Sequence, residues 1–417
     1  MKKYKILGIS LALSLALTGC TTTDITLSDT SNEINLEVSW WGGDSRNEYT
    51  LEALREYEKE NRNINIDMVY GEFTGFEAKN DIKMFSKNES DVMQINYAWM
   101  EKYNQQGLSF YDLNSLVRYI DLSQYDKEIL EYGQNEKGEQ IALPIALNAE
   151  IVWYNKSIYD TYGLELPTTW NDFFEAAKVM RKDGIYPLDM DISAMWQGLV
   201  AYTEQKTGHS VFDEENNFNF TEKDIEVMLS FYEKLVSNGV IEGVQNRKES
   251  KLFQGKYAAS IQWVSNASKY EGYISQARGE CVGKVAPTLV GAKRKGWYVK
   301  PATLYSIGAH SKNPEEAAKL LNYMVSDDDM VIKQGLDKGV PCNKKAIEIL
   351  TQENMLEGNQ YETSVAAEQQ DYPLMSPYFE VTMYQEVLKN ATDQILYAGY
   401  TIPQAAKEAY KTIMAGQ

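Results

Sequence analysis

Alternating strand and helix patterns constrain the fold of this chain most strongly. From Ile34 to Trp40, apolar and polar residues alternate with the period of two of a half-buried strand. A helical pattern follows from about Asn47 to Glu60, and strand patterns return at Asn63–Tyr70 and Asp91–Ile95. Strands that alternate with helices are typical of the α/β class, so we expect a mainly parallel sheet with helices on both faces.

A second block with the same pattern begins after Pro144. Polar residues that cap helices mark several helix ends, because their side chains bond backbone N–H groups that lack helical partners. We expect strands at Ile151–Tyr154 and Thr303–Ile307, and a helix from Trp170 to about Lys182 that is capped by Thr168-Thr169. Thr221 and Asp224 are expected to form a capping box at the start of a helix that ends at Asn238-Gly239. A further helix is expected to start at Asn313-Pro314, and the region from Glu380 to Met414 is expected to be helical with an interruption near Gly399.

The first residues form a secretory leader. Lys2, Lys3 and Lys5 precede an apolar run from Ile6 to Leu17, which is too short to span a bilayer. The sequence Leu17-Thr18-Gly19-Cys20 resembles the lipobox of bacterial lipoproteins, in which the cysteine is lipidated and becomes the first residue. We therefore expect a signal peptide at residues 1–19 and a lipidated tether at residues 20–33, with an ordinary cleaved signal as the alternative.

Charge and composition exclude several function classes. The formal net charge is −19, and loss of the three leader lysines makes it more negative still, so nucleic-acid binding is excluded. The 2 histidines, His209 and His310, argue against histidine triads and multi-histidine zinc sites, and we expect no metal or other cofactor. Cys281 and Cys342 are expected as free buried thiols, although a single disulfide remains possible.

Candidate ligand-binding residues follow the predicted strands, since open α/β sheets bind ligands beyond the carboxyl ends of their strands. These segments combine aromatic side chains with amides and carboxylates. Aromatic rings stack on the apolar face of a sugar ring, and amides and carboxylates bond its hydroxyl groups. The candidates are Trp41, Gly42, Asp44, Arg46, Asn96, Tyr97, Trp99, Asn148, Glu150, Trp196, Trp263, Asn266 and Tyr378.

Purely structural roles compete with these assignments. The chain contains 8 Trp, 29 Tyr and 12 Phe, most of which must fill hydrophobic cores. Trp40 alternates to the opposite side of its strand from Trp41 and is expected in the core. Asp44 either caps the following helix or pairs with Arg46, and Glu150 either accepts a ligand or pairs with a lysine.

Several short motifs together resemble the family 1 extracellular solute-binding proteins of bacterial ABC importers, the group that includes maltose-binding protein. The strongest is the combination of Trp153-Tyr154-Asn155-Lys156 with Leu166-Pro167-Thr168-Thr169-Trp170. Weaker landmarks occur along nearly the whole mature chain, at Ser39–Gly43, Asp91–Gln94 with Asn96, Leu143-Pro144, Phe253–Ala259, Asn313–Ala318 and Gly339–Pro341. Asn148 departs from the pattern, since maltose-binding protein has a carboxylate there.

The resemblance implies a two-lobe periplasmic-binding-protein-like (type II) α/β fold, with hinge crossovers and a ligand cleft between the lobes. Lobe 1 is expected to contain residues 34–146 and about 302–345, and lobe 2 residues 147–301 and about 346–417. It further implies ligand contacts at Trp41, Gly42, Asp44, Asn96, Asn148, the Trp196 region, Trp263 and Tyr378, and no catalytic residues. The paired Trp40-Trp41 and the turn with Phe73 and Phe76 favour an oligosaccharide.

The partners implied are an oligosaccharide and the transmembrane subunits of an ABC permease. The membrane is contacted through the lipid anchor alone, the protein is expected as a monomer, and its location is the outer face of a Gram-positive-type cell membrane. The alternatives are a lipid-anchored glycoside hydrolase, for which Asp44, Glu150 and Asp191 are the candidate carboxylates, and a surface carbohydrate adhesin.

Overall fold

The computed structural model describes residues 33–73, 75–105, 108–243 and 250–416. The predicted signal peptide, Cys20 and nearly all of the tether lie outside the described residues. Within the described ranges, no helix is both long enough and apolar enough to cross a membrane.

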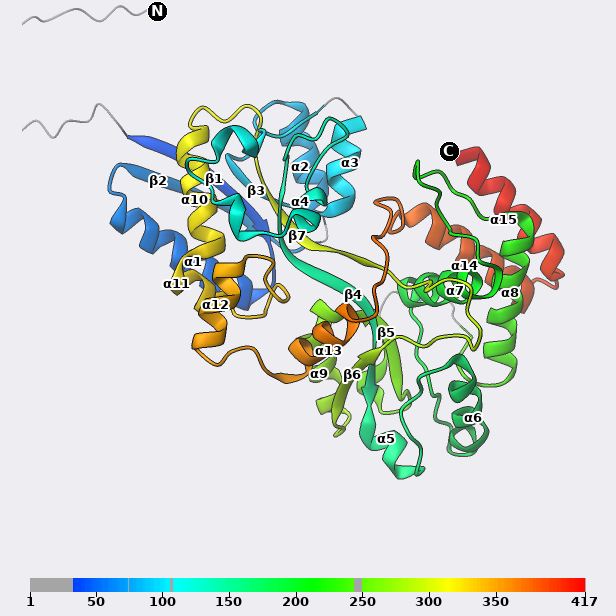
Figure 1. Cartoon of the computed structure of the whole chain (residues 1–417). Coiled ribbons are helices and arrows are strands. Elements are labelled where there is room, and N and C mark those ends of the chain that lie inside the picture. Colours follow the sequence, from blue (N-terminus) through cyan, green and yellow to red (C-terminus); the bar gives the residue numbers. More distant parts are fainter. Residues whose placement is uncertain (1–32, 74, 106–107, 244–249, 417) are drawn as a thin grey trace, which may run out of the picture.

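A seven-stranded sheet runs through the described part of the chain, with the strand order β2-β1-β3-β7-β4-β5 and β6 also paired to β4. Its two ends belong to different halves of the molecule, which Figure 1 shows at upper left and lower right. The strands are β1 (Ile34–Trp41), β2 (Ile64–Gly71), β3 (Val92–Ile95), β4 (Leu143–Asn155), β5 (Ala259–Trp263), β6 (Cys281–Val285) and β7 (Val299–Ile307).

The strand directions correct the expectation of a mainly parallel sheet, which is wrong. Only the β1–β2 and β1–β3 pairs are parallel among the named strand pairs of the described residues. The pairs β3–β7, β4–β7, β4–β5 and β4–β6 are antiparallel. The cause is that β4 carries the chain out of the first half and β7 carries it back, so the two strands run in opposite directions side by side. Strand periodicity reveals each strand but carries no information on this return path.

The first half buries its apolar residues between the β1, β2, β3 and β7 strands and helices (Figure 1). Trp40 is fully buried there and stacks on Tyr70, with ring centroids 5.0 Å apart, which confirms its predicted core position. The helices of this half are α1 (Asp44–Glu60), α2 (Phe76–Phe85), α3 (Tyr97–Gln105), α4 (Lys127–Glu131), α10 (Pro314–Ser326), α11 (Asp328–Gln334) and α12 (Lys344–Gln352).

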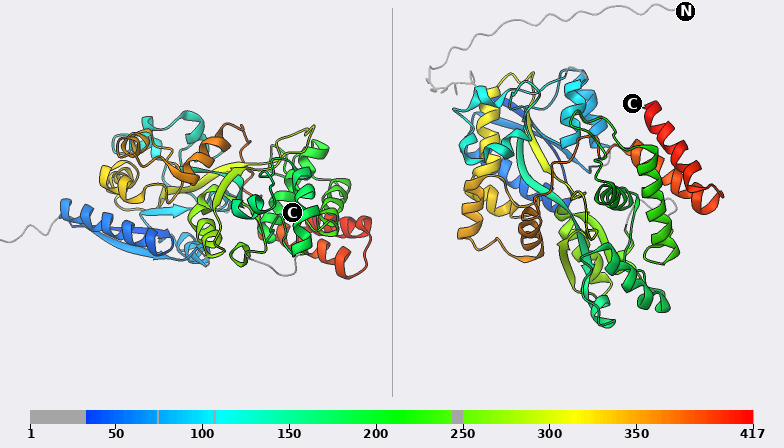
Figure 2. Two further views of the ribbon diagram at one scale, coloured as in Figure 1. Left: turned by 90° about the horizontal axis from the view of Figure 1, so that it is seen from below. Right: turned by 45° about the vertical axis from the view of Figure 1, so that its right-hand side comes forward.

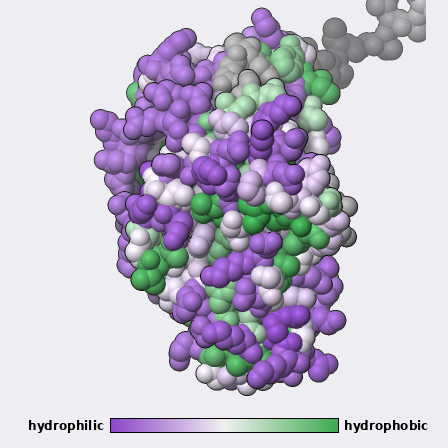
Figure 3. Space-filling model, turned by 90° about the vertical axis from the view of Figure 1, so that its right-hand side faces the viewer, coloured by the Kyte–Doolittle hydropathy of each residue, from purple (hydrophilic) through white to green (hydrophobic). Residues whose placement is uncertain are grey.

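The second half has the larger hydrophobic core, which is rich in buried aromatic residues. Helix α14 packs against α7, α8 and α15, so the C-terminal helices close one side of this half (Figure 2). The outer face of this side is mainly hydrophilic (Figure 3). The helices are α5 (Lys156–Thr161), α6 (Trp170–Met180), α7 (Ile192–Thr207), α8 (Glu222–Ser237), α9 (Ala267–Gln276), α13 (Gly358–Glu368), α14 (Thr382–Tyr397) and α15 (Ile402–Gly416).

Several predicted helix ends are confirmed. Thr169 forms a capping box with Asp172 at the start of α6, and Thr221 forms one with Asp224 at the start of α8. Asn313 precedes α10, whose first residue is a proline. The predicted break in the C-terminal helical region lies at Gly399, which has a φ of 72° between α14 and α15.

Both cysteines of the described chain are free thiols, as favoured from the sequence. Burial raises the pKa of the Cys281 thiol to about 12 and raises that of Cys342 further. Both side chains are therefore protonated at neutral pH, which makes them poor nucleophiles.

The last passage of the chain between the halves occurs later than the sequence indicates. Ile349 and Leu350 of α12 pack with Val331 of α11 in the first half. Ala367 of α13 packs instead with Trp153 in the second half. We therefore propose the expected lobe boundaries with one change, in which the final crossing lies between α12 and α13 rather than near residue 345.

Gly339 lies between α11 and α12, where the chain passes the β4 strand. Its φ is +109°, and a Cβ atom there would lie 2.9 Å from the Cβ of Ala146. We predict that Gly339→Ala lowers the free energy of unfolding by about 1–3 kcal/mol, because both the backbone angle and the contact disfavour a side chain. Chemical denaturation measures this change.

The matched control is Gly272→Ala, in the middle of α9. A Cβ atom at Gly272 meets nothing within 4 Å. This substitution should stabilise the protein by about 0.5–1 kcal/mol, because alanine favours the helix over the unfolded chain. Equal effects of the two substitutions would contradict the role assigned to Gly339.

Candidate functional site

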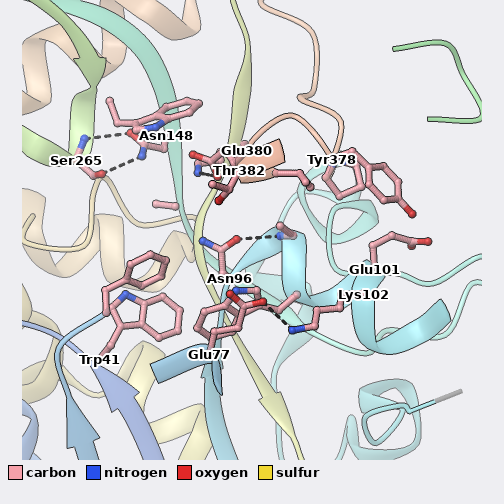
Figure 4. Close-up of a pocket in the computed structure, with 18 of the residues that line it drawn as sticks. Trp41, Glu77, Asn96, Glu101, Lys102, Asn148, Ser265, Tyr378, Glu380 and Thr382 are labelled. Atoms are coloured by element: carbon pink, nitrogen blue, oxygen red, sulfur yellow. Dashed lines mark hydrogen bonds and ion pairs between the residues drawn. The ribbon is translucent and has the colours of Figure 1, made fainter. Parts of the chain in front are cut away.

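A cavity of about 860 Å³ lies between the two halves of the molecule. Its wall combines the ends of β1, β3 and β5 with residues of β4, β7 and α14 (Figure 4). The lining residues are Trp41, Arg46, Phe73, Glu77, Asn96, Ala98, Trp99, Glu101, Lys102, Asn148, Trp263, Ser265, Asn266, Lys300, Ala302, Pro377, Tyr378, Glu380, Val381, Thr382, Met383 and Gln385.

Aromatic rings form the wall contributed by the first half. Trp41 lies against Trp99 at 5.0 Å and against Phe73 at 5.5 Å between ring centroids. Phe73 in turn stacks on Trp99 at 5.9 Å with the rings nearly parallel. Phe73 is 50% exposed, so this cluster presents an apolar ring surface to the cavity and to solvent.

Trp263 provides the aromatic surface of the second half. The Lys300 ammonium lies 4.4 Å from the centre of its ring, which is a cation–π distance. Lys300 also forms a hydrogen-bonded ion pair with Glu380. These contacts fix the ring beside a charge pair that joins β7 to the segment before α14.

Two amide side chains have their positions fixed by hydrogen bonds. Asn148 donates to the hydroxyl of Ser265 at 2.9 Å and accepts from the backbone N–H of the same residue at 3.0 Å (Figure 4). The side-chain oxygen of Asn96 accepts from the backbone N–H of Ala98 at 2.9 Å, at the start of α3. Both amides retain further bonding capacity, which suits them to hold hydroxyl groups.

The cations of the cavity wall are each paired with carboxylates. Lys102 lies 2.8 Å from both Glu77 and Asp81, a grouping that Figure 4 shows in part. Arg46 lies 3.0 Å from Asp337, and Lys300 is paired with Glu380. The wall therefore offers hydrogen-bonding groups and aromatic faces, with little uncompensated positive charge.

The structure brings together much of the set predicted from the sequence. The predicted residues that line this cavity are Trp41, Arg46, Asn96, Trp99, Asn148, Trp263, Asn266 and Tyr378. They come from segments far apart in the chain, and the sheet brings the strand ends together.

Other predicted residues lie outside this lining. Gly42 is close-packed, since a Cβ atom there would meet Arg46 at 2.5 Å, and Asp44 is an exposed residue of the first turn of α1. Trp196 is buried in the second core, where its ring N–H donates to the carbonyl of Phe379. Glu150 is fully buried and accepts from the backbone N–H of Tyr298 at 3.0 Å. Tyr97 lines a neighbouring cavity.

Burial explains why Glu150 differs from the expectation. It lies in β4, and its side-chain carboxylate is held by the backbone N–H of Tyr298, directly before β7. Loss of hydration raises the pKa of Glu150 well above its usual value, against the opposing effect of the Tyr298 hydrogen bond. Glu150 therefore lies outside the cavity lining, unlike the expected ligand contact.

Sequence reasoning missed the charged residues of the wall. Glu77 directly follows Phe76 at the start of α2, and Lys102 lies about one turn after Trp99 in α3. Glu380 and Thr382 follow Tyr378 closely, so a wider window around that residue includes them. Lys300 has no local signal, because its partner is 80 residues away in the sequence.

The carboxylates considered for a glycosidase do not line the cavity. Asp191 is buried at the start of α7, where it accepts from the backbone N–H of Ala194 at 2.9 Å. Asp44 is exposed and Glu150 is enclosed by the sheet. Glycoside hydrolysis needs two carboxyl groups that flank the scissile bond, an arrangement that these residues do not form at this cavity.

A buried lysine lies behind Arg46. Lys338 donates to the hydroxyl of Tyr305 at 2.5 Å, and its ammonium lies 6.0 Å from the ring centre of Tyr49. Burial and, to a smaller extent, the charge of Arg46 lower the pKa of Lys338 to about 7, against the opposing effect of Asp337. This cluster connects the cavity wall to the segment that contains Gly339.

Comparison with known proteins agrees with this architecture. The family model of bacterial extracellular solute-binding proteins matches residues 43–331. The multiple sugar-binding protein of Streptococcus mutans is 24% identical over 183 residues, an alignment that covers 43% of this chain and only 41% of that relative.

Two solved structures match far more of the chain. A periplasmic solute-binding protein from Pectobacterium atrosepticum has a TM-score of 0.83 at 26% identity, covering 91% of this chain and 97% of the other. A periplasmic oligogalacturonide-binding protein from Yersinia enterocolitica, in complex with saturated digalacturonic acid, has a TM-score of 0.81 at 28% identity, covering 90% and 97%.

The lowered pKa of Lys338 predicts how stability changes with pH. Its pKa is about 7 in the folded protein and about 10.4 in the unfolded chain. Between these values the unfolded chain binds a proton that the folded chain lacks, so this residue makes stability rise with pH. Relative to Lys338→Met, the free energy of unfolding of the natural protein should rise by up to about 1.4 kcal/mol per pH unit.

Denaturant titrations at several pH values from about 7 to about 9.5 measure this difference. Lys178→Met is the control, because Lys178 is exposed on α6 and pairs with Glu175 of its own helix. The control should run parallel to the natural protein. Parallel curves for Lys338→Met as well would contradict the shifted pKa.

Proposed function

This chain belongs to the family of bacterial extracellular solute-binding proteins, and from that membership we propose that it captures a neutral oligosaccharide for a carbohydrate ABC importer. The protein acts as a receptor without catalysis, and the cavity between its halves is the binding site. The ligand contacts are assigned to the predicted residues that line this cavity, Trp41, Arg46, Asn96, Trp99, Asn148, Trp263, Asn266 and Tyr378.

The observation that carries the proposal is the pair of aromatic walls. The cluster of Trp41, Phe73 and Trp99 belongs to one half, and Trp263 belongs to the other. Sugar rings stack on such surfaces, while Asn96 and Asn148 supply bonding groups for hydroxyls. A cavity of about 860 Å³ lies within the usual range for sites that enclose small molecules.

Pairing of the wall cations favours a neutral sugar. A carboxylate of a uronic acid would have to replace Glu380 at Lys300, or Glu77 and Asp81 at Lys102, to gain a charged partner. Since the wall carboxylates would also repel it, such a ligand gains little from these lysines. This chain therefore differs in proposed ligand from the oligogalacturonide-binding protein that it resembles in fold.

Closure of the cavity provides the transport signal. The halves are joined through β4, β7 and the passage between α12 and α13, which act as the hinge. A sugar that contacts both aromatic walls binds the closed form more strongly and so shifts the population toward it. The permease then recognises the loaded, closed protein.

The leader completes the proposal. Cleavage before Cys20 and lipidation of that residue anchor the protein to the outer face of the cell membrane, with residues 20–33 as the tether. A monomer held in this way remains next to its permease.

The first prediction from this proposal concerns ligand class. The protein from Thr21 onward should melt a few degrees higher with one class of neutral oligosaccharide, because ligand at about 100 times its Kd adds about 2.7 kcal/mol. Digalacturonic acid at the same concentration should give a much smaller shift. A larger shift with digalacturonic acid would contradict the neutral assignment, and hydrolysis products would contradict the receptor function.

The second prediction concerns the exposed ring of the aromatic wall. Phe73→Ala removes a stacking surface at the cavity and should weaken oligosaccharide binding about tenfold in isothermal titration calorimetry. Phe85→Ala is the matched control, because Phe85 is also exposed, at 59%, and lies outside the cavity lining. An equal loss of affinity in both variants would contradict the assignment of the aromatic wall to the binding site.

A further inference from the structure

A second cavity of about 400 Å³ lies beside the first. Pro377 contributes to the walls of both cavities. The start of α3 also faces both, since Asn96 and Ala98 line the first cavity and Tyr97 between them lines the second. The two cavities are therefore adjoining parts of the space between the two halves.

The wall of the second cavity has the same chemical character as that of the first. Tyr97 of the first half and Phe212 and Tyr298 of the second provide aromatic surface. Ser210 and Asn216 add polar groups to the rim. Aromatic faces with hydroxyl and amide groups nearby are suited to sugar rings.

Arg294 is fixed in this wall by a buried carboxylate. Its Nε lies 3.3 Å from Glu204, which is fully buried and also accepts from the hydroxyl of Tyr298 at 2.5 Å and the backbone N–H of Val211 at 2.7 Å. This contact uses Nε, so the terminal nitrogens of the guanidinium are further donors for a ligand oxygen. The Arg294 side chain is 38% exposed, so it remains accessible.

A turn that includes Asp213 forms part of the rim. Asp213 accepts from the backbone N–H of Asn217 at 2.8 Å, and Asn216 between them has a φ of 63°. The carboxylate of Asp213 is thus occupied within the turn, and Arg294 is already paired with Glu204. Since Glu214 adds a further carboxylate to the lining, the wall disfavours an anionic ligand group and suits neutral hydroxyl groups.

The geometry points to an extended binding groove, in which the second cavity holds further sugar units of a chain whose first units fill the larger cavity. The inference rests on the proposed function and adds the length of the ligand. Short oligosaccharides occupy the first cavity alone, and longer ones gain contacts with Tyr97, Arg294 and the turn at Asp213.

The test measures affinity against chain length. Isothermal titration calorimetry is run with neutral ladders from disaccharide to heptasaccharide, namely the malto-, cello-, xylo-, arabino- and galacto-oligosaccharides. For a ladder that binds, affinity should rise by about tenfold or more from the short members to the long members. Ser210→Trp, which fills the second cavity from its partly exposed rim, should abolish this rise while the affinity for short members stays the same.

Ser237→Trp is the matched control, since it introduces the same ring at an exposed serine that lines neither cavity and should keep the full length dependence. Arg294→Gln is a second variant, which should lower affinity for long members only and decides the question if Ser210→Trp fails to fold. The extended groove is overturned if affinity stops rising at the trisaccharide, or if it rises as much in Ser210→Trp and Arg294→Gln as in the natural protein. In either case, binding of short oligosaccharides still supports the proposed function. Absence of binding by every ladder overturns both.

Discussion

The antiparallel pairing of β4 with β7 is the interaction on which the rest of the structure depends. These strands connect two hydrophobic cores, and their register shifts around Ala146, next to Pro144, which has no N–H to donate. Asn148 of β4 and Lys300 of β7 are paired residues in this ladder, so the hinge itself supplies polar groups to the cavity. The strands β4 and β7 therefore both join the two halves and form part of the cavity wall.

Charge pairing shapes the cavity as strongly as the aromatic rings do. Partly buried lysines and arginine are tolerable because carboxylates hold them, and the same carboxylates reduce what an anionic ligand would gain. Lys300 shows both effects, since it lies over Trp263 and is paired with Glu380. The proposed preference for a neutral ligand thus follows from the ion pairs that stabilise the cations of the cavity wall, without any further group that would exclude anions.

Local signals made a large part of this architecture predictable. The capping boxes of α6 and α8 and the alternation along β1 depend on residues within a few positions of one another, and all are confirmed. Trp196 and Glu150 do not line the cavity because distant residues set their surroundings: Trp196 donates to the carbonyl of Phe379, and Glu150 accepts from the backbone N–H of Tyr298. For the same reason no local pattern reveals the Lys300–Glu380 pair, or the antiparallel return of β7.

The segment of residues 373–381, here called the strap, couples these features. Its Met375 donates to the carbonyl of Val299 at 2.8 Å, and Val299 donates to the carbonyl of Pro373 at 3.0 Å, so the strap is bonded to the start of β7. The next residue of β7, Lys300, holds Glu380 at the other end of the strap. Pro377, between these two attachments, lines both cavities, so the two cavities share one wall element that is fixed to β7. The start of β7 and the attached strap belong to the second half, so a movement of the second half relative to the first changes both cavities together, which supports the proposed single groove.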